Sequence, residues 1–178
     1  GRDGRALRWR IEHAQHLHPT DVPRFARLGV IASMQGVHAS SDGPWVPKRL
    51  GEPRAGERTY VWRSLIDSGA LVSNGTDVPV EDIDPLASFR ASVTREMVNG
   101  QRFHPEQNMT RQEALASYTW NNAYAGFEED LKGSLAPGKL ADFVVLDRDI
   151  LRVPDAELAS AQVLHTVLAG RVVYSRAP

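Results

Sequence analysis

Three polar side chains follow short apolar or alternating segments, at positions where side chains often take part in chemistry. Asp77 follows an apolar run over residues 70–75, and Pro79 prevents that strand from simply continuing. His13 ends an alternating segment and Gln35 ends an apolar one. At the carboxyl ends of strands in α/β proteins, such residues gather around ligands and reacting groups.

A histidine and an aspartate that end two strands of one sheet suit a borderline divalent cation, above all Zn²⁺. The sequence contains no cysteine, so a metal site must use His and carboxylate ligands. Such a cation acidifies water, and Asp77 could take the released proton and pass it to a leaving nitrogen. Two ligands are a weak signal. Asp77 as a turn cap beside Gly75, and His13 as an ordinary core or surface residue, stay open.

The elements around these residues follow the pattern of a parallel α/β sheet. A strand over residues 7–13 presents Leu7, Trp9, Ile11 and His13 on one face. Helices beginning at Thr20 and Thr59 are each closed by a glycine and followed by a strand, over residues 30–35 and 70–75. We therefore expect His13, Gln35 and Asp77 at one edge of the sheet.

Residues 36–57 are dense in glycine and proline, and we predict a long loop there. Long loops inside compact domains are often lids or binding loops. This segment carries His38, Asp42, Trp45 and Arg49, a plausible set of substrate contacts. Of these, His38 and Trp45, together with Gln35, are the predicted substrate-binding residues. The alternative is a solvent-exposed loop without a binding role, in which one Trp packs against the protein surface.

The character of the chain changes near residue 132. Before it, Asp84–Pro85 begins a helix that Asn99–Gly100 ends, and a capping box at 110–113 begins another. After it, a turn at 135–139, a strand at 143–147 and a hairpin over 163–174 follow. We predict domains at 1–132 and 133–178.

Composition narrows the function classes. The chain has 178 residues, 42% hydrophobic and 24% charged, which is typical of a globular protein with one domain or parts of two. A net charge of −1 gives no general electrostatic attraction to nucleic acid or anionic membranes. No apolar run approaches the roughly 20 residues that a membrane-spanning helix needs. We expect a cytoplasmic protein with a small-molecule partner. The chain begins with Gly1 rather than Met, which indicates a processed or truncated product.

Four motifs occur in order and carry a specific resemblance: RIEHAQ (residues 10–15), IASMQ (31–35), GTDVPVE (75–81) and GSLAPGKLADF (133–143). Together they resemble the C-terminal part of an amidohydrolase-superfamily enzyme. The most similar branch is amidohydrolase family 3, which includes N-substituted formamide deformylases and, more distantly, D-aminoacylases.

The resemblance implies an α/β fold: the C-terminal part of a metal-dependent (β/α)₈ TIM barrel, plus returning strands of a small β-sandwich. His13 would be a metal ligand on the sixth barrel strand, and Asp77 metal ligand and general base on the eighth. Gln35 and His38 would follow the seventh strand and face the substrate. The implied activity is hydrolysis of a non-peptide C–N bond in a small molecule, with one or two divalent ions, zinc foremost.

Several features that such enzymes need are not visible. His16-Leu17-His18 has the spacing of the family's first-strand pair but follows no strand of its own, so ordinary loop histidines are the better interpretation. No lysine ends an apolar strand, so no metal-bridging lysine is visible. We therefore expect an enzyme fragment, alone incomplete and inactive, that self-associates or is completed by its missing N-terminal part. A non-catalytic module completed by another chain, and an unrelated α/β domain, are the alternatives.

Overall fold

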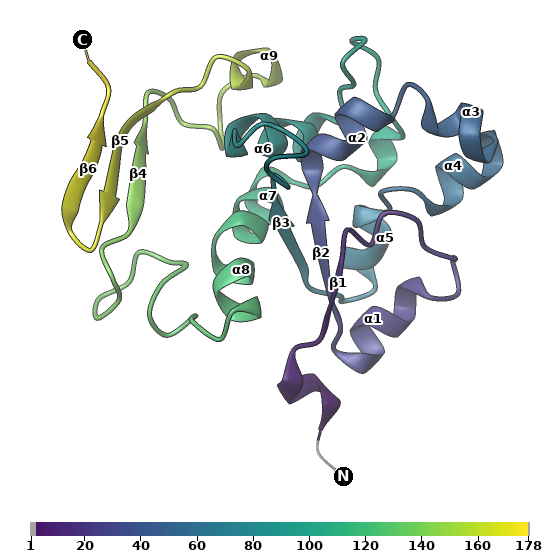
Figure 1. Ribbon diagram of the computed structural model, residues 1–178, viewed down its shortest axis with the longest axis horizontal. Coiled ribbons are helices and arrows are strands. Elements are labelled where there is room, and N and C mark those ends of the chain that lie inside the picture. The colour runs from purple at the N-terminus through teal and green to yellow at the C-terminus, as the bar shows by residue number, and fades with distance from the viewer. Residues whose placement is uncertain (1–2, 178) are drawn as a thin grey trace.

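The computed structural model describes residues 3–177, which contain two separate three-stranded sheets. The first is parallel, in the order β1 (Arg10–Glu12), β2 (Ile31–Gln35) and β3 (Val72–Gly75). The second is antiparallel, in the order β4 (Phe143–Leu146), β5 (Val163–Leu168) and β6 (Arg171–Ser175). Figure 1 shows the second sheet at the C-terminal end of the molecule, beyond α7 and α8.

Helices connect and cover these strands. They are η1 (Gly4–Leu7), α1 (Val22–Leu28), α2 (Gly36–Asp42), α3 (Val46–Leu50), α4 (Glu52–Arg58), α5 (Trp62–Asp67), α6 (Pro85–Thr94), η2 (Pro105–Gln107), α7 (Arg111–Tyr118), α8 (Trp120–Ala125) and α9 (Asp155–Leu158). None of the helices within residues 3–177 combines the length and the apolar character needed to cross a bilayer.

The parallel sheet confirms the predicted helix–glycine–strand pattern. Gly29 and Gly69 both adopt positive φ, 68° and 85°, which a residue without Cβ does at little cost. Each glycine turns the chain from a helix into the next strand. In register, Glu12 lies beside Ser33 and Gln35 beside Gly75, so the three strands end at one edge.

The main core lies around β2 and β3. Ala32, Met34 and Val72 are buried there, and the indole of Trp62 on α5 is fully buried against them. β2 is buried along most of its length because it is the central strand. β1, in contrast, is exposed at all three of its residues.

The predicted one-sided row from Leu7 to His13 is wrong. Only Arg10–Glu12 pair as a strand, Arg8 takes φ 48° before it, and Trp9 and Ile11 are 65% and 48% exposed. Alternating apolar residues of a strand become buried only where other elements cover that face of the sheet. Among residues 3–177, β1 is an edge strand with a neighbour on one side, so its apolar residues stay exposed.

The chain before β1 is held by Arg8. Its guanidinium lies 3.7 Å from the ring centroid of Tyr124 and 4.3 Å from that of Phe127, and it forms an ion pair with Glu129. The cation and the two rings attach this end of the chain to the segment after α8.

The long loop predicted for residues 36–57 is also wrong, because α2, α3 and α4 occupy most of it. Pro47 and Pro53 lie in the first turns of α3 and α4. In a first turn the missing N–H of proline costs nothing, since that N–H has no helical partner. Proline therefore marks helix starts in this segment.

Other predicted helix limits shift by several residues. Thr59 follows the last residue of α4 as its cap instead of beginning α5, and the next residue, Tyr60, takes φ 52° and turns the chain before α5. α6 ends at Thr94 because Arg95 takes φ 57°. The predicted cap at Asp84 and the capping box of Thr110 with Glu113 are confirmed.

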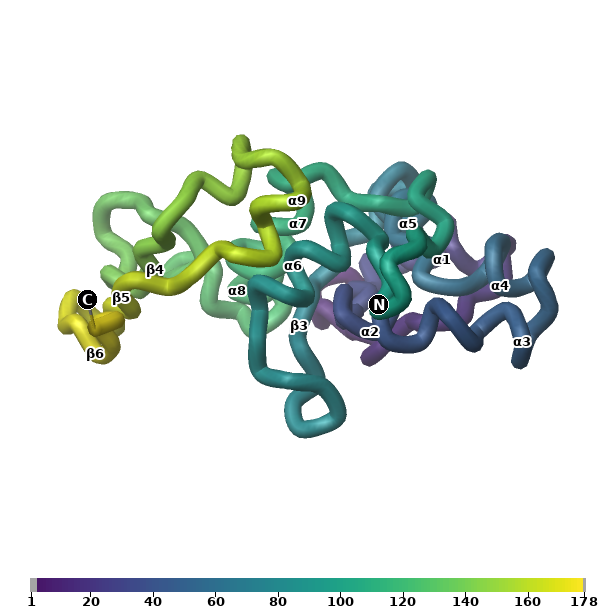
Figure 2. Tube along the Cα trace, turned by 90° about the horizontal axis from the view of Figure 1, so that it is seen from above, coloured from purple at the N-terminus to yellow at the C-terminus, as the bar shows by residue number. Residues whose placement is uncertain are grey.

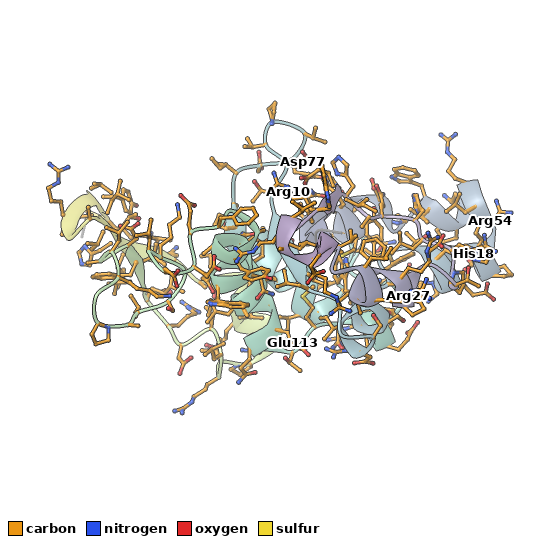
Figure 3. All side chains as sticks on the ribbon, turned by 90° about the horizontal axis from the view of Figure 1, so that it is seen from below. Arg10, His18, Arg27, Arg54, Asp77 and Glu113 are labelled. Atoms are coloured by element: carbon orange, nitrogen blue, oxygen red, sulfur yellow. The ribbon has the colours of Figure 1, made fainter. Side chains whose placement is uncertain are left out.

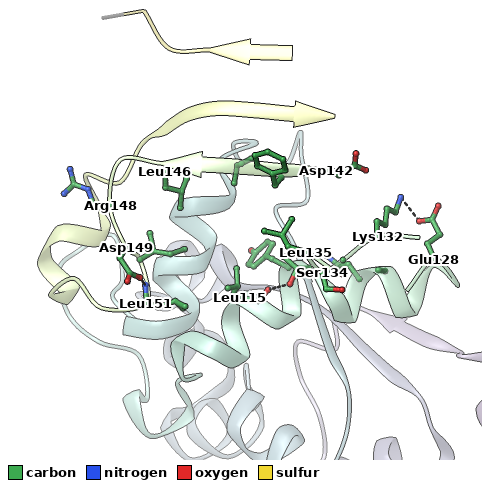
Figure 4. A pocket seen from close by; sticks show the side chains of 18 residues that line it. Leu115, Glu128, Lys132, Ser134, Leu135, Asp142, Leu146, Arg148, Asp149 and Leu151 are labelled. Carbon is green, nitrogen blue, oxygen red and sulfur yellow. Dashed lines mark hydrogen bonds and ion pairs between the residues drawn. The ribbon is translucent and has the colours of Figure 1, made fainter. Parts of the chain in front are cut away.

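A pocket of about 750 Å³ lies between the second sheet and helices α7 and α8 (Figure 4). Its walls are largely apolar and include Leu115, Leu135 and Leu146. The hairpin of β5 and β6 is confirmed, with Ala169 and Gly170 at positive φ in its turn. A complete β-sandwich and a domain boundary at residue 132 stay predictions.

Candidate metal centre

Three chain segments deliver polar residues to the carboxyl edge of the parallel sheet. His13 directly follows β1, His38 lies in the first turn of α2 directly after β2, and Asp77 lies two residues after β3. Because the strands are parallel and in register, these three positions meet at one edge. Figure 3 marks Asp77 at the base of the projecting loop that follows β3.

The side chains of His13, His38 and Asp77 converge. One potential ligand atom from each lies within 4.8 Å of the others. Asp77 Oδ2 is 3.5 Å from His38 Nε2 and 3.9 Å from His13 Nδ1. The two imidazole rings are nearly parallel, 19° apart, with centroids separated by 6.0 Å. One nitrogen of each imidazole and one carboxylate oxygen thus lie close enough together to share one ion.

The burial of the three side chains differs. His38 is buried, the Asp77 side chain is 29% exposed, and that of His13 is 50% exposed. Within residues 3–177, the buried Nε2 of His38 has no hydrogen-bond partner. A buried polar nitrogen without a partner is costly, and a cation beside Asp77 would remove that cost. The residues therefore fit a divalent metal.

Gln35 orients the more exposed of the two imidazoles. Its Oε1 lies 3.0 Å from His13 Nδ1, and the Gln35 side chain is buried. An amide oxygen accepts, so in this pairing Nδ1 carries the proton and Nε2 keeps its lone pair. Histidines that bind metals commonly donate their other N–H in this way.

The backbone around the cluster takes uncommon conformations. His13, Ala14 and Asp77 have φ values of 65°, 41° and 63°. Left-handed conformations cost non-glycine residues about 1–2 kcal/mol, and less for Asp, whose side chain bonds locally. Such residues concentrate at functional sites, where surrounding contacts hold them in place.

The loop between β3 and α6 begins at Asp77 and projects away from the rest of the chain (Figure 2). Its first turn closes with Val80 N donating to Asp77 O at 2.8 Å. Farther along, Glu81 Oε1 accepts from Ser41 Oγ of α2 at 2.6 Å. The loop that carries Asp77 is thereby attached to the helix that carries His38.

The remaining candidates from the sequence are Trp45, His16 and His18. Trp45 directly precedes α3 and is 46% exposed. The guanidinium carbon of Arg49 lies 6.0 Å from the centroid of its ring. His16 Nδ1 lies 3.1 Å from Thr59 Oγ1, and His18 Nδ1 lies 2.8 Å from Thr20 Oγ1. His18 and Asp77 are far apart in Figure 3. The interpretation of His16 and His18 as ordinary loop histidines agrees with these contacts.

Sequence reasoning missed the network beside the cluster, in which Asp42 joins Gln15 to Tyr60. One signal in the sequence could have indicated it. His38 and Asp42 are four residues apart, which places them on the same helix face if residues 36–42 are helical, as the structure shows.

Comparisons with known proteins agree on one family. A model of the amidohydrolase family matches residues 1–174. Protein LONG AFTER FAR-RED 3 of Arabidopsis thaliana is 40% identical over 171 residues, which are 96% of this chain and 29% of that protein. The N-substituted formamide deformylase of Arthrobacter pascens is 32% identical over 167 residues, 94% of this chain and 31% of that enzyme. The chain thus spans about a third of the length of these relatives.

Among solved structures, the chain is similar to an uncharacterized metal-dependent hydrolase from Pyrococcus horikoshii OT3. The TM-score is 0.72 at 31% identity, covering 83% of this chain and 30% of that one. The similarity therefore extends from sequence to three-dimensional arrangement.

Proposed function

Because this chain belongs to the amidohydrolase family, we propose that it forms part of a metal-dependent hydrolase acting on non-peptide C–N bonds of small molecules. The observation that carries the proposal is the convergence of His13, His38 and Asp77, in which the buried Nε2 of His38 faces Asp77 without a hydrogen-bond partner within residues 3–177. The deformylase relative supports an amide-type substrate.

The proposed ligands are His13, His38 and Asp77. Two imidazoles and a carboxylate are ligand types that zinc binds, and they would form the part of its ligand set that this chain supplies. When bound, the cation supplies Lewis acidity toward a substrate carbonyl and lowers the pKa of water. This assignment gives His38, whose sequence suggested a substrate contact, a ligand role, because its buried Nε2 lies 3.5 Å from Asp77 Oδ2.

The chain's own residues move the proton and orient the site. Asp77 Oδ2 accepts a proton from the attacking water and returns it to the leaving nitrogen, as a general base and then a general acid. Gln35 holds the His13 ring through Nδ1. Trp45, a residue that is 46% exposed, remains a proposed substrate contact.

We also propose that the parallel sheet is the sixth to eighth strands of a (β/α)₈ barrel, over residues 1–132. Residues 133–178 would be strands of a β-sandwich. The exposed β1 and the share of the relatives' length that the chain spans support this arrangement. In such a barrel the remaining metal ligands lie on strands outside this chain. The alternative is a module without activity of its own, which a further part of the protein completes.

Asp77→Asn tests the proposed site. Asn tolerates the left-handed conformation of residue 77, so the fold should persist while the anionic ligand is lost. We expect Zn²⁺ affinity, measured by chelator competition, to fall by more than roughly 100-fold. Removing a residue that only hydrogen-bonds a metal ligand already lowers metal affinity about 10–100-fold, and Asp77 is itself a proposed ligand. In the protein completed by the rest of its barrel, hydrolysis should be abolished.

Asp82→Asn is the matched control, since it makes the same change at an exposed position of the same loop. It should bind Zn²⁺ as the unmodified chain does. Unchanged metal binding and near-normal turnover in folded Asp77→Asn would contradict the proposal.

A further inference from the structure

We propose that Asp42, the last residue of α2, is a positioning residue that fixes His13 relative to His38. The inference rests on the proposed metal site and identifies what sets its geometry. Asp42 contributes none of the three converging ligand atoms. Its effect reaches the site through two other side chains, Gln15 and Tyr60.

A single oxygen of Asp42 joins these two side chains. Asp42 Oδ2 accepts from Gln15 Nε2 at 2.9 Å and from the Tyr60 hydroxyl at 2.6 Å. Gln15 Nε2 also contacts the Tyr60 hydroxyl oxygen, which closes a three-membered network. Hydrogen bonds to an ionised acceptor are stronger and more restrictive than those between neutral groups.

On the His13 side, the network holds the turn after β1. Gln15 lies two residues beyond His13, and its carbonyl accepts from Tyr60 N at 2.9 Å. Leu17 N donates to Arg58 O at 2.8 Å, so segments 15–17 and 58–60 run side by side. His13 and Ala14, both with positive φ, therefore lead into a segment that is fixed on its far side.

On the His38 side, α2 transmits the constraint. His38 and Asp42 are four residues apart on one helix, so their side chains lie one turn apart on the same face. A shift of Asp42 along the helix axis would move His38 with it. The carboxylate thus connects the element bearing one proposed ligand to the turn bearing another.

Tyr60 is a rigid partner for this role. It is 2% exposed, and both burial and the hydrogen bond to Asp42 raise the pKa of its hydroxyl far above the usual value, so the hydroxyl remains a donor. Its carbonyl accepts from Arg95 Nη1 at 2.8 Å. Arg95 is itself buried, with its guanidinium 4.4 Å from the Trp62 ring centroid.

The experiment is a metal titration of three variants of the full chain. Asp42→Ala removes both hydrogen bonds, and we expect Zn²⁺ affinity to fall about 10-fold, the lower end for outer-sphere partners of metal sites. Asp42→Asn keeps an oxygen that can accept both bonds, so its affinity should stay within about 3-fold of wild type. Asp67→Ala, the same change at the end of α5, is the matched control and should leave affinity unchanged.

Two further measurements separate positioning from general loosening of the fold. Thermal unfolding without metal gives the temperature below which each variant is folded, and the titrations are run well below it. The visible spectrum of bound Co²⁺ reports ligand geometry, and it should change in Asp42→Ala and be restored in Asp42→Asn.

Each outcome decides between the claims. Loss of binding in Asp77→Asn together with wild-type binding in folded Asp42→Ala overturns the positioning role and leaves the metal site standing. Wild-type binding in Asp77→Asn overturns the site itself. If Asp42→Ala does not fold, Tyr60→Phe and Gln15→Leu each remove one donor to Asp42. Wild-type affinity and spectrum in both would overturn the inference, and weakened binding in both supports it.

Discussion

The imidazole of His13 is half exposed, so its orientation depends on the buried amide of Gln35. Gln35→Leu keeps the side-chain volume and removes the acceptor for Nδ1. We expect Zn²⁺ affinity to fall about 10-fold, because the ring loses the partner that fixes its tautomer and angle. Chelator competition measures the affinity, and ¹⁵N NMR of the ring nitrogens reports the tautomer.

Gln35→Glu is the matched control for this prediction. Glu keeps an Oε1 acceptor at the same position in the side chain, so this variant should preserve the proton on His13 Nδ1 and most of the Zn²⁺ affinity. An unchanged tautomer and unchanged affinity in Gln35→Leu would show that Gln35 does not orient His13.

Most residues at the candidate metal site could be predicted from their positions at the ends of strands. His13, Gln35 and Asp77 each follow an apolar or alternating segment, and parallel pairing brings such ends together. The grouping of His38 with them depends on a helix that begins at Gly36, directly after β2. A segment rich in glycine and proline does not reveal that helix, so sequence alone placed His38 in a loop.

At the scale of elements, α7 is attached to α5 through Glu113. The Glu113 carboxylate completes the capping box with Thr110 and forms an ion pair with Arg63. The hydrogen bond from Arg63 is the largest cause that lowers the pKa of Glu113, to about 2 from an ordinary value of 4.5. The ionised form is therefore the one that the folded chain favours.

Because the pKa is lower in the folded chain, this contribution is complete above pH 4.5 and is lost as the pH falls toward 2. We expect Glu113→Gln to lower the free energy of unfolding by about 1 kcal/mol at pH 7, a discounted value for a partly exposed pair. Urea unfolding at pH 7 and at pH 3 measures the difference, which should shrink at the lower pH.

Glu128→Gln provides the control, since Glu128 forms an exposed ion pair with Lys132 at 2.7 Å. It should change the free energy of unfolding by a few tenths of a kcal/mol at most, as exposed pairs do. A Glu113→Gln effect that stays constant between pH 7 and pH 3 would contradict the proposed linkage.

Element limits were predictable where local chemistry decides them. Asp84, Thr110 and the glycines that end α1 and α5 satisfy backbone groups at helix ends, and each lies where the sequence indicates. The lengths of β1 and α6 were not predictable. β1 is short because Arg8 and His13 adopt positive φ on either side of it, and α6 is short because Arg95 turns inward to bond Phe103 O.

At the scale of the whole molecule, the two edges of the parallel sheet differ. Asn121 and Asn122 of α8 donate to Val72 O and Asn74 O at 2.8 and 2.9 Å and so cover the outer edge of β3. Within residues 3–177, β1 pairs on one side alone, and Ile11 in it and Trp9 directly before it are exposed. An uncovered edge strand with apolar side chains favours pairing with another chain or segment.

We therefore expect the isolated 178-residue chain to self-associate through β1. Ile11 is 48% exposed, and covering the rest of its side chain would stabilise the associated state by about 1 kcal/mol. Ile11→Lys should therefore raise the dissociation constant about fivefold, the change that corresponds to this free energy. Sedimentation velocity over a range of concentrations measures the constant.

Val80→Lys is the matched control, because Val80 is 72% exposed on the loop after Asp77 and lies outside both sheets. If Val80→Lys weakens association as strongly as Ile11→Lys, general apolar exposure is responsible and the strand edge is not. Supplying the rest of the proposed barrel should abolish self-association, since the same edge would then be paired within one protein. An isolated chain that stays monomeric at all concentrations and hydrolyses amides would contradict both the edge argument and the proposal that this chain is part of a larger barrel.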